Sequence, residues 1–238
     1  MSRHSPLSSD THKTLRVNRA RKAELGDAEM CCLVVPAEFR EVQAHYPIVF
    51  QKDPSQGSMN AVALFGFTRG ENLFLNARGW DARYVPLAMD TRPFLVGLDR
   101  DGGSGAHVHI DLDHPRAEAK TGERVFDEAG EPTPFLQAMT GKLGRLHEGY
   151  QASRGFFDAL ERHELLEPFS LEISLDDGSQ NQLVGFQTIN ETRLQSLDAA
   201  ATAELHAAGY LMPIFMAVAS LSNLADLVGR KNESLVHA

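Results

Sequence analysis

Short apolar-rich segments bounded by turn residues recur along the first half of the chain and predict strands there. Such patterns mark residues 46–50, 61–67, 73–75, 84–88, 94–98 and 106–112. Turn-forming residues 53–57 separate the first two segments, which are therefore expected to form a hairpin. Residues 99–105 are rich in glycine and are expected to form the loop between the last two segments.

The second half of the chain begins with the spacing of helices. Leu136, Met139 and Leu143 predict a helix that begins after Thr133, whose hydroxyl suits a cap. A second helix is expected over residues 153–165.

Residues 169–189 return to alternation and predict a hairpin with its turn at residues 176–178. Asn190 suits the cap of the next helix, whose apolar stripe ends at Gly209. Apolar residues nearly encircle the last helix, over residues 214–228, which is therefore expected to be central. We predict an α+β protein in which hairpins form an antiparallel sheet and the helices of the second half pack on it.

Domain limits follow from the same pattern. Residues 1–29 show no sustained apolar period and are expected to be a flexible segment, whereas residues 30–238 are expected to form a single globular domain. The chain is 42% hydrophobic and 23% charged, which is typical of a soluble domain. Cys31 and Cys32 adjoin apolar residues, and we expect two buried thiols rather than a disulfide.

Charge and motifs exclude several function classes. A formal net charge of −9 argues against a nucleic-acid partner. The first 29 residues are polar and contain no apolar signal segment, so a cytoplasmic protein is expected. Gly209 and Pro213 interrupt the uncharged segment 207–225, so no membrane span is expected. Nucleotide-binding and nucleophile signatures are missing, and no cofactor is expected.

The clearest chemical pattern is the strand-like run His107-Val108-His109-Ile110-Asp111. Side chains alternate along a strand, so its two histidines and its aspartate share one face, and their donor atoms suit zinc or non-haem iron. The run resembles the His-x-His-x-Asp-His run of metallo-β-lactamase-like hydrolases, but Leu112 stands where the last histidine should be. One hypothesis is a metal-dependent hydrolase or oxygenase; the alternative is a half-buried strand whose polar face meets water.

Two further clusters are candidates for ligand binding. The first is Asp113-His114-Pro115-Arg116, which also suits a structural corner where the proline fixes the turn and Arg116 pairs with a carboxylate.

The second cluster is Trp80-Asp81-Ala82-Arg83-Tyr84. Trp80 and Tyr84 suit either packing or a ligand-facing aromatic site, and Asp81 is expected to pair with Arg83. For both clusters the structural interpretation is the favoured one.

Several segments resemble the SapC family, named for a bacterial surface-layer-associated protein. They are Phe65-Gly66-Phe67, residues 80–87, 112–116 and 169–194, and the similarity extends over residues 47–235. The resemblance implies a bacterial protein linked with surface-layer or outer-envelope systems, including TonB-dependent receptors.

These observations leave three functional hypotheses and do not decide whether the protein is an enzyme. The leading hypothesis is an accessory or binding protein that recognises a protein or peptide partner of an envelope system, with Trp80, Arg83, Tyr84, Asp113, His114 and Arg116 as the residues to test. The second is the metal-dependent enzyme. The third is a structural partner in a homo-oligomer, which the apolar C-terminal helix would support.

Overall fold

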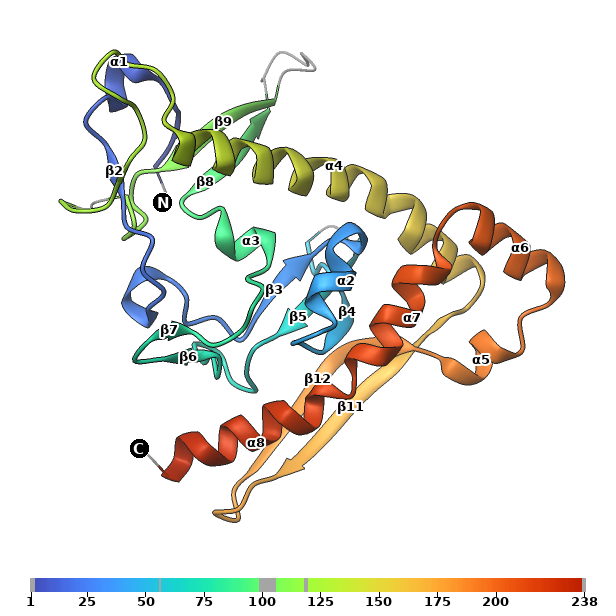
Figure 1. Cartoon of the computed structure of the whole chain (residues 1–238). Helices are drawn as coiled ribbons and strands as arrows, with labels where there is room; N and C mark the ends of the chain where they lie inside the picture. The colour runs from blue at the N-terminus through green and yellow to red at the C-terminus, as the bar shows by residue number, and fades with distance from the viewer. Residues whose placement is uncertain (1–2, 56, 99–105, 118–119, 237–238) are drawn as a thin grey trace. The chain divides into compact units, whose positions relative to one another are not determined.

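The computed structural model describes residues 3–55, 57–98, 106–117 and 120–236. They divide into two compact units: unit 1 comprises Met1–Ala28, Leu75–Trp80 and Leu87–Glu148, and unit 2 comprises Glu29–Phe74, Asp81–Pro86 and Gly149–Ala238. Every strand pair is antiparallel and the longer helices come from the second half, which confirms the predicted α+β class (Figure 1). The predicted loop 99–105 lies outside the described residues.

Unit 1 is built from short strands and helices. Its strands are β1 (His4–Pro6), β2 (Arg16–Val17), β6 (Leu75–Asn76), β7 (Gly79–Trp80), β8 (Phe94–Leu98), β9 (Ala106–Asp111) and β10 (Glu123–Arg124). Its helices are α1 (Ser9–His12), the 3-10 turn η1 (Ala23–Leu25), α3 (Leu87–Asp90) and the first part of α4 (Pro134–Arg162). The strands pair as β1-β9-β8, β10-β2 and β6-β7.

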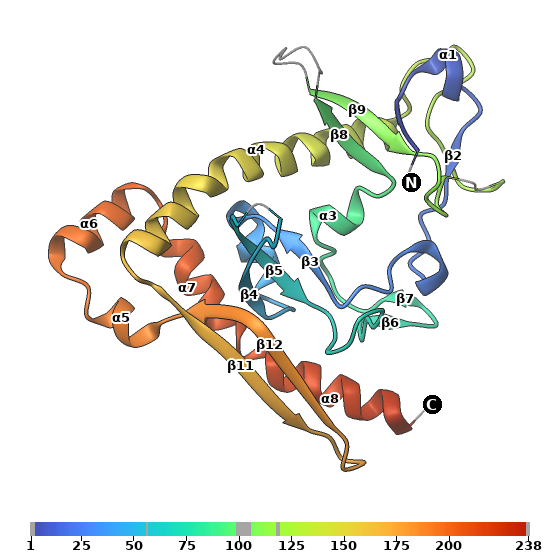
Figure 2. The same ribbon diagram turned by 180° about the vertical axis from the view of Figure 1, so that it is seen from behind.

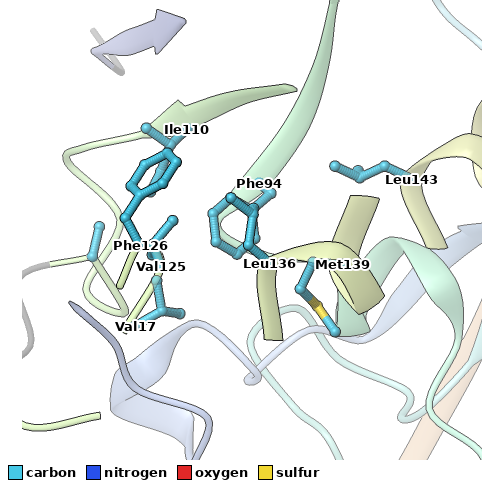
Figure 3. Packing of buried hydrophobic residues seen from close by; sticks show 9 residues of the cluster. Val17, Phe94, Ile110, Val125, Phe126, Leu136, Met139 and Leu143 are labelled. Atoms are coloured by element: carbon cyan, nitrogen blue, oxygen red, sulfur yellow. The ribbon is translucent and has the colours of Figure 1, made fainter. Parts of the chain in front are cut away.

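The core of unit 1 lies where β8 and β9 meet the first turns of α4. Ile110 pairs with Phe94, and both side chains join the buried cluster that Figure 3 shows. Val108 and Leu112 pack against the same cluster. The apolar half of the predicted alternation in β9 is therefore confirmed, because these three residues lie on one face of the strand.

Residues 3–28 contribute to unit 1, whereas the sequence predicts a flexible segment up to residue 29. His4 of β1 pairs with Asp111 of β9, and Arg16 of β2 pairs with Arg124 of β10. Val17 is buried. Main-chain pairing and buried charge hold this segment, and neither is visible as an apolar period in the sequence.

The strand predicted at residues 84–88 is wrong. Leu87–Asp90 instead form the helix α3, in which Leu87 and Met89 are buried. The hydroxyl of Thr91 donates to the carbonyl of Leu87 (2.9 Å) and closes this turn.

Unit 2 is organised around a five-stranded sheet. Its strands are β3 (Cys31–Val34), β4 (Ile48–Lys52), β5 (Met59–Leu64), β11 (Leu166–Ser174) and β12 (Gln180–Ile189), in the order β11-β12-β4-β5-β3. Its helices are the 3-10 turn η2 (Pro36–Glu38), α2 (Phe39–Val42), the second part of α4, α5 (Glu191–Gln195), α6 (Ala199–Ala207), α7 (Leu211–Ser220) and α8 (Asn223–Val236).

Both predicted hairpins of unit 2, β4–β5 and β11–β12, are confirmed. Helix α7 packs on β4 and β12, and the N–H of Ile48 donates to the buried hydroxyl of Ser220 (2.8 Å). Both views show α8 beside the β11–β12 hairpin, where the N–H of Asp176 donates to the side chain of Asn232 (3.1 Å) (Figure 1, Figure 2). Cys31 and Cys32 are free thiols, of which Cys32 is buried.

Two predicted helix boundaries are wrong. The two helices predicted between 134 and 165 are the single 29-residue helix α4, because Gly149 and Gly155 continue the helix and admit close contacts with Val35 and Tyr210. The stripe that ends at Gly209 is divided between α5 and α6, since Asp198 caps α6 by accepting from the N–H of Ala201 (2.8 Å). The predicted Asn190 cap of α5 is confirmed.

The prediction of a central last helix is also wrong. Helix α7 buries Ile214, Ala217 and Ser220 on one side and leaves Met212 and Phe215 each 55% exposed on the other. By length and composition alone, Leu211–Val236 is long and apolar enough to cross a membrane, and 22% of its most apolar stretch is buried. The chain turns at residues 221–222 between α7 and α8.

Candidate functional site

A groove of about 690 Å³ lies in unit 2 between α4 and the β4–β5 hairpin. We call it the α4 groove. The helix supplies one continuous face, since its lining residues recur at intervals of three and four: Tyr150, Ser153, Arg154, Phe157, Asp158 and Glu161. The opposite wall comes from β3, β5 and the β4–β5 turn: Leu33, Met59, Asn60, Asp53, Gly57 and Ser58.

Apolar side chains form the floor and one edge of the α4 groove. Phe157 is held in place by edge-to-face contacts with Phe50 and Phe156, at centroid distances of 6.4 and 5.5 Å. Tyr150 is 38% exposed, and Leu33 presents its side chain from the edge strand β3. A ligand that covered these two side chains would gain buried apolar area without disturbing the core.

Charged side chains surround the apolar part, with acids in excess. Asp53, Asp158 and Glu161 oppose the single guanidinium of Arg154. Among the described residues, Asp158, Glu161 and Arg154 form no ion pair with one another or with neighbours. The groove therefore presents a net negative surface on which Asp158 and Glu161 can accept hydrogen bonds from a ligand, whereas Asp53 already accepts from Ser55.

The polar groups of the groove suit binding better than acid–base chemistry. Burial, reinforced by the nearby Cys32 and Glu38, raises the pKa of Tyr150 to about 12, so its phenol stays neutral. The hydroxyl of Ser153 donates to the carbonyl of Gly149 (2.6 Å) and is committed to the helix backbone. Neither group is placed as a base or a nucleophile.

Tyr84, a predicted ligand residue, is a structural anchor of unit 2. Its hydroxyl donates to Glu38 (2.7 Å), and its own carbonyl accepts from the hydroxyl of Tyr46 (2.5 Å). Glu38 is buried and also accepts from the N–H of Val35 (3.1 Å). The ring of Tyr84 thus supplies the donor that a buried carboxylate requires.

Asp81 pairs with a different residue from the one that the sequence predicts. Its carboxylate accepts from Arg230 (2.9 Å), not from Arg83. Arg230 also lies over the ring of Phe74, 4.4 Å from its centroid. Arg83 is exposed, and Trp80 is half-buried in unit 1.

The cluster Asp113–Arg116 forms the corner after β9 in unit 1. Arg116 is 1% exposed and donates to Asp27 (2.6 Å), which is 0% exposed. The same guanidinium donates to the carbonyls of Asn18 and Ala20 (2.8 and 2.7 Å). Arg116 therefore has the structural role that the corner interpretation predicts, and it is not accessible to a ligand.

The other two residues of the corner serve the same turn. Asp113 lies at the surface and accepts from the N–H of Arg3 (2.9 Å). His114 accepts from the N–H of Arg116 (3.2 Å), and burial together with Arg116 and Arg92 lowers its pKa. No interaction found at this corner points to a ligand.

The candidate metal residues share one face of β9, as predicted, but do not converge. The ring of His109 lies over Gly97 on β8, where an added Cβ would overlap it. Asp111 lies 3.9 Å from His4, and His107 pairs with Gly97 in the register. Within the described parts of the chain, no group of three or more His, Cys, Asp or Glu side chains is placed to hold a metal ion.

Sequence reasoning missed the α4 groove. The sequence predicts no role for its lining residues on α4 or for Met59, and Leu33 appears there only as an apolar neighbour of the two cysteines. The signal that the sequence does carry is the helical spacing that places Tyr150 and Phe157 on the same face as Arg154, Asp158 and Glu161.

In comparison with known protein families, residues 7–227 match the family described as SapC. No curated protein and no solved structure matches the chain.

Proposed function

Because the chain belongs to the SapC family, we propose, in line with the leading sequence hypothesis, that it is a binding protein that holds a polypeptide segment in the α4 groove. The observation that carries the proposal is the composition of that groove. Exposed Tyr150 and Leu33 lie in a cavity of about 690 Å³ that also contains Asp158 and Glu161, two carboxylates without an ion pair among the described residues. That volume suits several side chains of a ligand.

An extended peptide fits the elements that border the groove. Leu33 belongs to β3, which ends the five-stranded sheet, so main-chain groups of β3 on its outer side are not engaged in that sheet. A peptide that lay along this edge would add a strand, and its alternate side chains would reach the groove. Main-chain bonds would supply affinity, and the groove would supply selectivity.

The charge of the groove favours a cationic segment. Three carboxylates against one guanidinium would pair with Lys or Arg side chains, while Tyr150 and Phe157 would receive an apolar or aromatic neighbour. We propose that such a segment belongs to a protein of a bacterial envelope or surface-layer system and is bound in the cytoplasm. The absence of a converging donor set in β9 gives the metal-enzyme alternative no support among the described residues.

Selection from a displayed library of random 12-residue peptides on the full chain would test the proposal. We expect enriched peptides that combine Lys or Arg with an apolar residue. Their affinity, measured by fluorescence anisotropy, should fall when Asp158→Asn and Glu161→Gln are combined. These side chains are exposed, so the variant should keep its fold.

Glu172→Gln is the matched control, because Glu172 is an exposed carboxylate on β11 outside the groove. Its affinity for the enriched peptides should equal that of the parent. No enrichment over the bare support, or equal loss in both variants, would contradict the proposal.

A further inference from the structure

A second apolar surface lies on the outer side of α7, apart from the α4 groove. Met212 and Phe215 are more than half exposed there, although both are large apolar residues. Beside them is a groove of about 370 Å³ between α5, α6 and α7, which we call the α7 groove. Its apolar lining comes from Leu194, Leu197, Leu211, Phe215 and Val218, so the exposed ring of Phe215 is part of the groove wall.

The exposed side chain of Met212 and an apolar groove therefore occur on the same face. Such a face can be self-complementary, because a two-fold axis can place Met212 of each copy against the groove of the other. Met212 has the size and flexibility to enter a cavity lined by leucine, valine and phenylalanine.

The distribution of charge also favours a second copy of this chain as the partner that covers the α7 groove. Residues 207–225 contain no Asp, Glu, Lys or Arg, in a chain whose formal charge is −9. Two copies repel each other elsewhere, so a surface on which they meet must be free of like charge. An anionic lipid surface would favour a cluster of Lys and Arg beside the apolar face, and a single Arg40 beside Met212, with the carboxylate of Glu191 in the groove, does not form one.

The charges at the margin of this face are complementary under two-fold packing. Nη2 of Arg40 lies 3.6 Å from the sulfur of Met212, and Glu191 is a lining residue of the α7 groove. When Met212 of one copy enters the groove of the other, Arg40 approaches Glu191 of that partner copy. The opposite signs of these two residues favour this register.

We propose that the α7 face, defined by Met212, Phe215 and the α7 groove, is the interface of a two-fold homodimer of this chain. The full-length protein should then have a mass of about twice 26.2 kDa in light scattering coupled to gel filtration. Phe215→Glu should give the monomer mass at the same concentration. Val184→Glu is the control, because Val184 is 59% exposed on β12 and is absent from this face; that variant should remain dimeric.

A charge exchange tests the register independently of folding. Arg40→Glu and Glu191→Arg should each raise the dissociation constant in sedimentation velocity severalfold, and the double variant should restore the parent value. A monomeric parent, a dimeric Phe215→Glu variant, or a double variant weaker than both single variants would overturn the proposal. Co-sedimentation of the parent with phosphatidylglycerol vesicles, lost in Phe215→Glu, would assign the face to lipid instead.

Discussion

Arg116 and Asp27 show how a charged residue comes to be buried in unit 1. The guanidinium gives one hydrogen bond to the carboxylate and two to backbone carbonyls, and so compensates much of its lost hydration. Neither residue is in a position where an apolar pattern would predict burial. Their pairing fixes residues 18–27 against the corner after β9.

Replacing Asp27 by Asn should destabilise unit 1 strongly. The variant keeps the shape of the side chain but leaves Arg116 charged, buried and without a counter-ion, which costs roughly 3–5 kcal/mol. The free energy of unfolding in urea measures this loss. Asp113→Asn is the control: it removes an exposed carboxylate that pairs with Arg3, and should cost at most about 1 kcal/mol. Equal losses would show that the Arg116 pair is not the stabilising contact.

Tyr150 should titrate later than an ordinary tyrosine. Its pKa is raised from 10.0 to about 12, so the unfolded chain loses this proton first as pH rises. The folded state then holds more protons, and stability falls between pH 10 and pH 12, having been fully present below pH 10. Tyr150→Phe should therefore lose less stability over that interval. Ultraviolet absorbance of the phenolate, as the difference between parent and variant, reports the pKa directly, and a midpoint near 10 would contradict the assignment.

Helix α4 depends on glycine at one position and merely tolerates it at another. At Gly149 a Cβ would meet Cγ2 of Val35 at 2.6 Å, whereas at Gly144 nothing lies within 4 Å. The first glycine permits close packing against the segment after β3. The second only adds flexibility to the unfolded chain.

The same substitution should therefore have opposite effects at the two sites. Gly144→Ala should stabilise the protein by about 0.5–1 kcal/mol, because alanine costs less entropy in a helix. Gly149→Ala should destabilise it by about 1–3 kcal/mol through overpacking against Val35. Thermal unfolding followed by circular dichroism distinguishes them, and a gain at both positions would show that Val35 can move aside.

At the scale of the whole molecule, features that depend on residues close together in the sequence are predicted well. Contacts between residues far apart in the sequence are predicted poorly. The β11–β12 hairpin follows from alternation and from the turn at residues 176–178, and Asn190 is a cap because its contact lies three residues away. The role of Tyr84 depends on Glu38, which is 46 residues distant. No pattern within either segment indicates that contact.

The α4 groove could not be predicted from the sequence, because it too depends on contacts between distant segments. Its walls combine Leu33 and Met59 with residues of α4 about a hundred positions later, and only the folded chain brings them together. The face of β9 was predicted correctly as a face, but convergence on a metal depends on side-chain directions across β1 and β8. Alternation along one strand does not contain that information.

The outer strand β11 has a consequence for aggregation. It ends the sheet of unit 2, and such edges invite further strands from other chains. Pro168 lacks the N–H that an added strand would use, and Glu167 and Glu172 would meet their own copies in a stack. Gly185, at φ +83°, accompanies a bulge opposite residues 169–171 that twists the hairpin away from a flat edge. Fibre growth along β11 is thereby opposed, which leaves β3, at the other end of the sheet, as the edge open to an added strand.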